Sequence, residues 1–123
     1  MFLRLLQPSP LAFGRTIRVI AIALAMLSVP AASAGAVTLD IKMFRYQPEV
    51  VEVSPGTTVV WTNSDDIDHT ITSASGTEPD DRFDSGRFGQ GESFSRTFTE
   101  PGEYHYICSM HPSMTGTIRV VAE

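Results

Sequence analysis

Residues 104–120 read YHYICSMHPSMTGTIRV, two runs of β composition that flank a short loop. In the first run, Tyr104 and Cys108 stand at positions of the same parity, so they share one face of the expected strand and His105 points to the other. The second run, residues 115–122, predicts the last strand of the chain. The stretch therefore predicts two strands and a connecting loop that starts at the single cysteine of the chain.

Short runs of the same kind recur upstream, and no long segment of residues 35–123 shows a helical period. The Ser-Pro-Gly-Thr sequence at 54–57 predicts a type II turn, because it places Pro at the second position and Gly at the third. Residues 46–48 are interpreted as an interruption between strands, and residues 74–90 as a long irregular connection. The expected strands cover residues 37–43, 50–53, 58–63, 69–73, 92–99, 104–108 and 115–122.

Seven or so short strands in fewer than 90 residues predict an all-β fold, a two-sheet antiparallel Greek-key β-sandwich. Phe83 and Phe88 are the residues of the long connection that we expect to pin it to the core. The fold forms a single domain, because the chain is too short for two.

The first 34 residues have a different composition from the rest of the chain. Three arginines precede an apolar run at 19–30, and the small-residue triplet ASA follows at 32–34. This order is typical of a secretory signal peptide that is cleaved after residue 34. An uncleaved anchor is the alternative, and the shortness of the apolar run disfavours it. The sequence therefore predicts a signal peptide at 1–34, a domain at 35–123 and a periplasmic protein.

The domain at 35–123 is acidic, with 14 acidic and six basic residues and a net charge of −8. Binding to phosphates needs a basic face, so nucleic acid is not an expected partner. Negative charge is compatible with a basic protein partner, and solubility alone explains it equally well. We expect a monomer and no membrane insertion of the mature chain.

Cys108, His111 and Met114 follow one another at spacings of three residues. They offer a thiolate, an imidazole and a thioether, which suit copper and not calcium or magnesium. A single cysteine cannot form an internal disulfide, and a free thiol is a liability in an oxidising compartment unless it is buried, reactive or metal-bound. The spacing therefore predicts a copper site on the loop.

A fourth ligand must come from elsewhere in the chain. His69 stands where a polar loop returns to β composition, a place where sites are built, and it is either a ligand or an ordinary surface histidine. His105 is disfavoured by its strand parity. Met110 competes with Met114 as the thioether, but it lies inside the turn, and we expect an exposed apolar contact there.

Over residues 35–123 the chain resembles a cupredoxin of the plastocyanin/amicyanin kind. The resemblance rests on VVWTN at 59–63 with the following His69-Thr70, FDSG at 83–86, FTEPGEY at 98–104, CSMHPSM at 108–114 and GTIRVV at 116–121. It implies one type 1 copper ion, cycling between Cu(I) and Cu(II), that is bound by His69, Cys108, His111 and Met114. The two-residue gap between the last two ligands is similar to that of amicyanin.

Two positions depart from the family pattern. Many members have Asn directly after the first ligand histidine, bridging toward the cysteine loop; here the residue is Thr70, whose hydroxyl offers a similar hydrogen bond. Asp68 precedes His69 where Pro or Gly is common. Our hypothesis is that Asp68, together with Asp65 and Asp66, favours Cu(II) and lowers the reduction potential.

The resemblance implies one-electron transfer between redox protein partners in the periplasm, such as a c-type cytochrome and a dehydrogenase or oxidase. In the family the port for electrons is the ligand histidine of the cysteine loop, here His111, with Met110 and Pro112 lining an apolar patch. We expect no enzymatic activity, because four ligands leave no open position for a substrate. The alternatives are a periplasmic copper carrier or storage protein with the same ligands, and a β-sandwich interaction module with a vestigial site.

Overall fold

The structure is a computed structural model, and it describes residues 35–75 and 81–123. The predicted signal peptide at 1–34 lies outside these residues. Within the two ranges no helix is long and apolar enough to cross a membrane. The strands of the described residues are β1 (Ala36–Ile41), β2 (Tyr46–Gln47), β3 (Val50–Val53), β4 (Thr57–Asn63), β5 (Thr72–Ser73), β6 (Ser93–Phe98), β7 (Gly102–Ile107) and β8 (Thr115–Val120).

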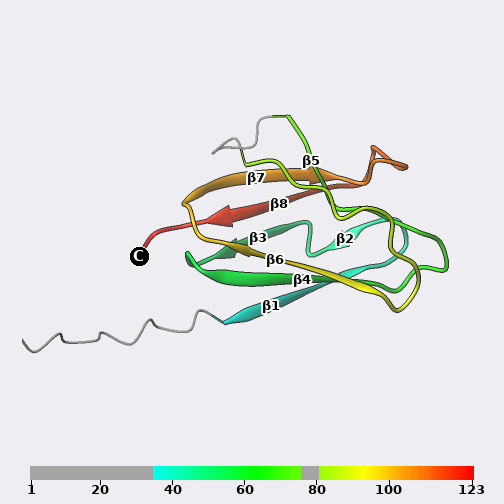
Figure 1. Cartoon of the computed structure of the whole chain (residues 1–123), viewed down its shortest axis with the longest axis horizontal. Helices are drawn as coiled ribbons and strands as arrows, with labels where there is room; N and C mark the ends of the chain where they lie inside the picture. Colours follow the sequence, from blue (N-terminus) through cyan, green and yellow to red (C-terminus); the bar gives the residue numbers. More distant parts are fainter. Residues whose placement is uncertain (1–34, 76–80) are drawn as a thin grey trace, which may run out of the picture. The chain divides into compact units, whose positions relative to one another are not determined.

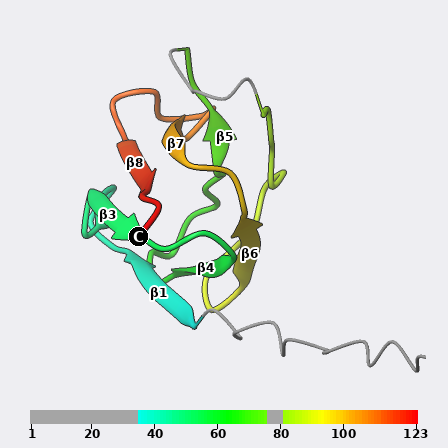
Figure 2. The same cartoon turned by 90° about the vertical axis from the view of Figure 1, so that its left-hand side faces the viewer.

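The strands form two four-stranded sheets (Figure 1). One sheet has the order β2-β1-β4-β6 and the other has the order β3-β8-β7-β5. Figure 2 shows β8, β7 and β5 on one side of the sandwich and β1, β4 and β6 on the other. The predicted all-β, two-sheet fold is confirmed.

The purely antiparallel arrangement in that prediction is wrong at two places. β1 pairs with β4 in parallel, and β3 pairs with β8 in parallel. The chain leaves the first sheet to form β3 in the second sheet and then returns to place β4 beside β1. Alternating apolar residues indicate which face of a strand is buried, and they do not indicate the direction of the neighbouring strand.

The core is built by the buried faces of the strands. In β4, alternate residues are buried from Thr57 to Asn63. Trp61 of β4 is fully buried and donates its Nε1–H to the hydroxyl of Tyr106 in β7, at 3.1 Å, across the two sheets. Gly116 lies opposite Tyr106 in β8, where a Cβ atom would come within 2.2 Å of the tyrosine ring. The core therefore fixes how the β7–β8 hairpin pairs.

The type II turn before β4 is confirmed. Gly56 has a φ of 86°, which a glycine adopts without strain, and Thr57 N–H donates to the carbonyl of Ser54 at 3.2 Å. The turn sets the start of β4 and thus its alternation of buried residues.

A second tight turn joins β1 to β2 and was not predicted. Lys42 and Arg45 exchange backbone hydrogen bonds of 3.0 and 3.2 Å, and the two residues between them, Met43 and Phe44, have φ values of 52° and 56°. This is the pattern of a type I′ hairpin turn, which prefers Asn-Gly at these two positions. Because Met-Phe carries no such signal, residues 46–48 were interpreted as an interruption, whereas they include β2.

One end of the sandwich carries the segments that matter for the site. The β1–β2 turn, the β4–β5 connection and the β7–β8 loop all lie at the end opposite the C-terminus (Figure 1). The described part of the long connection runs beside the β4–β5 segment, with bridges between His69 and Phe88 and between Thr72 and Asp84. Phe88 and Phe83 are buried, as predicted.

Candidate metal centre

The β7–β8 loop consists of two consecutive turns. His111 N–H donates to the carbonyl of Cys108 at 3.1 Å, and Met114 N–H donates to the carbonyl of His111 at 2.8 Å. Cys108 N–H donates to the carbonyl of Met114 at 3.2 Å and closes the loop at its base. The spacing of three in the sequence follows from this backbone pattern, because each candidate ligand ends one turn or starts the next.

His69 is held by a neighbouring segment of the chain. Its backbone exchanges two hydrogen bonds of 3.1 Å with Phe88, and its side chain is fully buried. Asn63, also fully buried, donates from Nδ2 to the carbonyls of Ile67 and Phe88 and accepts the N–H of Asp65 at its Oδ1. Asn63 therefore shapes the loop that leads from β4 to His69.

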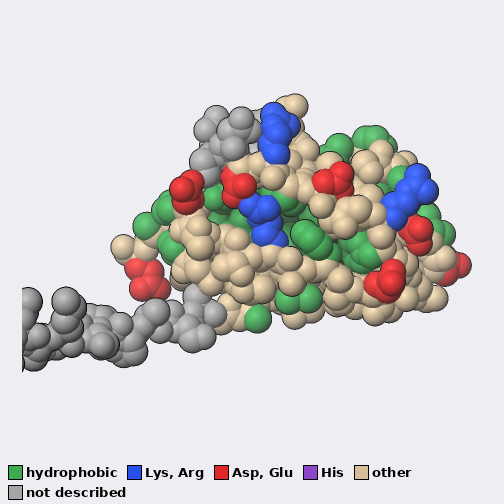
Figure 3. Space-filling model, viewed as in Figure 1, with side chains coloured by type: hydrophobic (Ala, Val, Ile, Leu, Met, Phe, Trp, Pro, Cys, Tyr) green, Lys and Arg blue, Asp and Glu red, His purple; other side chains and the backbone are tan. Residues whose placement is uncertain are grey.

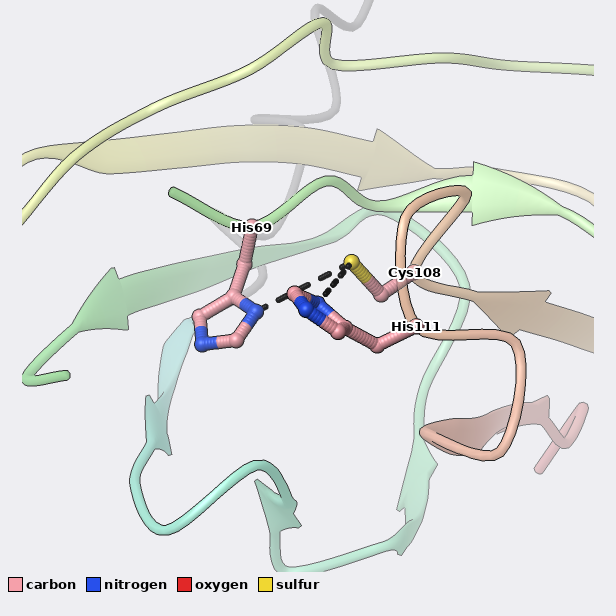
Figure 4. A group of neighbouring side chains, drawn as sticks. All are labelled: His69, Cys108 and His111. Carbon is pink, nitrogen blue, oxygen red and sulfur yellow. Dashed lines mark hydrogen bonds between the residues drawn. The ribbon is translucent and has the colours of Figure 1, made fainter. Parts of the chain in front are cut away.

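The side chains of His69, Cys108 and His111 converge (Figure 4). Their donor atoms lie within 4.8 Å of one another, and Cys108 Sγ is 3.8 Å from His69 Nδ1 and 3.6 Å from His111 Nδ1. Bonds of about 2.0 Å to nitrogen and about 2.3 Å to sulfur that meet at about 120° end about 3.7 Å apart. One buried thiol and two imidazoles at these separations fit a single copper ion.

Asp65 sets the tautomer of His69. Its Oδ2 lies 2.9 Å from His69 Nε2. Burial raises the pKa of the Asp65 carboxyl, but the N–H of Phe44, the His69 ring and the N–H of Met43 lower it, and the net shift is downward. Because a carboxylate only accepts hydrogen bonds, Nε2 carries a proton, and Nδ1, the ring nitrogen that faces the cysteine, is the one that a neutral imidazole offers to a metal.

Phe44 covers both imidazoles from the β1–β2 turn. Its ring meets the ring of His69 edge-on, with centroids 5.5 Å apart and an interplanar angle of 85°. It meets the ring of His111 in the same way, at 5.1 Å and 90°. The two histidines, from the β4–β5 connection and the β7–β8 loop, thus share one aromatic neighbour that comes from a third segment of the chain.

Thr70 connects the segment of His69 with the cysteine loop. Its backbone N–H donates to Cys108 Sγ at 3.4 Å, and its hydroxyl accepts the N–H of Ser109 at 2.8 Å. The expectation that a threonine hydroxyl bridges to this loop is confirmed. An N–H that donates to the sulfur stabilises the negative charge of a thiolate.

Three further residues were considered as ligands from the sequence: Met114, Met110 and His105. Met114 is 2% exposed and borders an open groove of about 500 Å³ that Phe44 also borders. Met110 is half-buried and packs against the core, so the expectation of an exposed contact is wrong; the two compact turns fold it inward. His105 bonds Thr117 Oγ1 through Nδ1 at 2.9 Å, and it alternates in β7 with the buried Tyr104 and Tyr106, so it lies on the other face of the strand as the parity argument expected.

Asn63 and Phe44 were not predicted as parts of the site, and Asp65 was named only for its charge. A polar residue at the end of an apolar strand indicates a loop-building side chain, so Asn63 had a recognisable signal. Asp65 was considered only as one of three charges, with Asp68 first among them. Asp68 is exposed, whereas Asp65 bonds His69 directly. For Phe44 the sequence holds no signal, because its place depends on the unpredicted turn.

Charged side chains are distributed over the surface. On the face drawn in Figure 3, acidic side chains are spread from end to end, and basic side chains stand apart from one another. The described residues on this face do not form the continuous basic surface that a phosphate backbone binds.

Comparison with known proteins relates the whole domain to copper proteins. The model of the family described as copper binding proteins, plastocyanin/azurin family, matches residues 33–121. Amicyanin-alpha of Methylorubrum extorquens is 31% identical over 96 residues, which cover 78% of this chain and 81% of the relative. Amicyanin of Paracoccus denitrificans is 31% identical over 86 residues, which cover 70% of this chain and 66% of the relative.

Solved structures give the same picture. A reduced amicyanin variant superposes with a TM-score of 0.65 at 30% identity, covering 70% of this chain and 82% of that chain. A copper-containing nitrite reductase from Thermus scotoductus superposes with a TM-score of 0.65 at 37% identity, covering 70% of this chain and 22% of that chain. The similarity to the reductase therefore concerns a minor part of that enzyme.

Proposed function

Since the chain belongs to the plastocyanin/azurin family of copper-binding proteins, we propose that it is a periplasmic blue-copper protein that carries single electrons between redox partners. In this proposal one type 1 copper ion is held by His69, Cys108, His111 and Met114. The observation that carries it is the convergence of a buried thiol and two imidazoles from two separate loops, at separations of 3.6 and 3.8 Å.

A copper ion at this place supplies one-electron chemistry, because copper is stable as both Cu(I) and Cu(II). The contribution of the chain is to hold the donors in one arrangement. The backbone of His69 is fixed by Phe88, and the loop from Cys108 to Met114 is closed by its own hydrogen bonds. Little of the protein therefore has to move when the charge of the centre changes.

His111 is the point at which we propose that electrons enter and leave. It is only half-buried, whereas His69 and Cys108 are fully buried, and the next residue, Pro112, is exposed. The proposed partners are a c-type cytochrome and a periplasmic dehydrogenase or oxidase, which a monomeric carrier visits in turn. The reductase that resembles this domain matches over only 22% of its length, and we propose no substrate chemistry for this chain.

The proposal is tested by adding Cu(II) to the purified protein. An intense visible band from thiolate-to-copper charge transfer is expected, and Cys108→Ser is expected to abolish it. His105→Ala is the matched control, because His105 lies outside the donor cluster, and this variant should keep the band. A colourless copper complex, or a site that binds zinc and refuses copper, would contradict the proposal.

Electrochemistry then separates transfer from copper handling. Reversible one-electron cycling with fast self-exchange supports an electron carrier. Loss of the ion on reduction, or its ready passage to a chelator, would instead identify a copper carrier or storage protein with the same ligands.

A further inference from the structure

The turn between β1 and β2 holds an unfavourable conformation at the surface. Met43 and Phe44 both have positive φ, which residues with a Cβ atom adopt only at a cost. Both are also large apolar side chains left exposed, Met43 by 72% and Phe44 by 49%. Neither the local sequence nor burial explains why the turn keeps this shape, so its support must come from another segment.

That support is the carboxylate of Asp65. Oδ1 accepts the N–H of Met43 at 2.7 Å, and Oδ2 accepts the N–H of Phe44 at 2.9 Å. The same Oδ2 accepts from His69 Nε2 at 2.9 Å. Hydrogen bonds to an ionised acceptor are about twice as strong as neutral ones. One side chain thus ties a strained turn to a histidine of the candidate metal centre.

The turn in its held shape brings Phe44 against both histidines. The ring lies edge-on to His69 and to His111, at 5.5 and 5.1 Å. His111 belongs to the β7–β8 loop. The three hydrogen bonds of the Asp65 carboxylate go to Met43, Phe44 and His69, and none of them goes to this loop. A change at Asp65 can therefore reach His111 in two ways: through the turn and the Phe44 ring, and through His69, whose ring centroid lies 5.3 Å from that of His111.

We propose that Asp65 is a positioning residue that locks the Met43–Phe44 turn over the two histidines, so that Phe44 shields the metal centre and sets its reduction potential together with Asp65. The part of this proposal that concerns the potential rests on the proposed copper function. The part that concerns the lock is a property of the chain alone.

The lock is tested first in the copper-free protein. In Asp65→Ala, amide hydrogen exchange at Lys42 and Arg45, whose N–H groups close the turn, is expected to accelerate by at least about tenfold, and the ring resonances of His111 are expected to shift. Asp66→Ala is the matched control, since it removes the same charge from an exposed neighbour, and it should do neither. Unchanged exchange in Asp65→Ala would overturn the lock, whether or not the protein binds copper.

A rescue variant guards against a general loss of folding. Asn is preferred at the first central position of a type I′ turn, so Met43→Asn stabilises the turn without the carboxylate. Added to Asp65→Ala, it is expected to restore part of the protection at Arg45, whose N–H donates to the carbonyl of Lys42 within the turn. If exchange stays fast across the whole domain in both variants, Asp65 serves the fold at large, and the positioning role is wrong.

A double-mutant cycle on the copper-loaded protein tests how Asp65 acts. If it acts through Phe44, then Phe44→Leu changes the reduction potential by less than half as much in Asp65→Ala as in the unsubstituted protein. If it acts by its charge alone, the two changes add, and the lock has no part in tuning the centre. Failure of the unsubstituted protein to bind copper would refute the proposed function and the tuning role, while the exchange experiment still decides the lock.

Discussion

The hydroxyl of Thr70 accepts the N–H of Ser109 at 2.8 Å, a hydrogen bond between residues 39 positions apart in the chain. Thr70 follows His69, and Ser109 follows Cys108, so this bond joins the two segments that carry the proposed ligands. Thr70 is 2% exposed, and water does not readily replace the hydroxyl. The alignment of the two segments should therefore depend on it.

We expect Thr70→Val to destabilise the copper-free protein by about 1–3 kcal/mol, because it keeps the shape of the side chain and leaves the Ser109 N–H without its acceptor. Denaturant unfolding measures the change. Thr70→Ser keeps the hydroxyl and serves as the control, and it is expected to lose less unfolding free energy than Thr70→Val. A larger loss in Thr70→Ser than in Thr70→Val would show that the methyl group, and not the hydrogen bond, matters at this position.

The proposal names Met114, and not Met110, as the thioether ligand, although both lie on the β7–β8 loop. Met114→Leu is expected to raise the reduction potential of the copper protein, because loss of a donor disfavours the more highly charged Cu(II). The copper-free protein should lose less than about 1.5 kcal/mol, since leucine has a similar volume. Met110→Leu is the control and should leave the potential unchanged. The reverse result, measured by voltammetry, would make Met110 the ligand.

Gly116 is expected to be intolerant of any side chain. A Cβ atom at this position would lie 2.2 Å from the ring of Tyr106, which is buried and hydrogen-bonded to Trp61. Gly116→Ala should cost about 1–3 kcal/mol of unfolding free energy, as overpacked cores do. Gly35→Ala, where nothing lies within 4 Å, should change the stability little. A similar stability of the two variants would show that the hairpin shifts to make room.

Buried tyrosines make the copper-free protein sensitive to high pH. Burial raises the pKa of Tyr46 and, despite the N–H that Trp61 donates, that of Tyr106. Above about pH 10, where a tyrosine of the unfolded chain loses its proton, the folded state binds more protons than the unfolded state. Stability should therefore fall as the pH rises beyond this value. A spectrophotometric titration should show no tyrosinate from these residues until the protein unfolds; tyrosinate signal from the intact fold would contradict this.

The sequence was sufficient for the fold class and for the loop that carries Cys108 and His111. Alternation of apolar residues reports burial directly, and spacings of three reflect turns that form within the loop itself. Both signals are local, so one chain is enough to read them. His69 needed the family resemblance, because nothing near it in the sequence indicates that it lies beside the cysteine.

The features that escaped prediction depend on distant partners. The direction of β1 against β4 is set by the path of the chain through the second sheet. The turn at Met43 and Phe44 is supported by Asp65, about 20 residues further along the chain. No propensity of Met or Phe favours such a turn, so β2 and the cover over the two histidines became visible only in the folded chain.

His69 and Cys108 are 39 residues apart in the chain and meet only when the sandwich has closed. A centre built from these side chains does not exist in a partly folded molecule, and metal binding is then coupled to completed folding. With the ligands proposed here, the blue colour of a preparation would measure the molecules that have folded completely and bound copper. Variants that fold slowly or incompletely would give a culture extract with weaker blue absorption, which can be measured before any purification or redox assay.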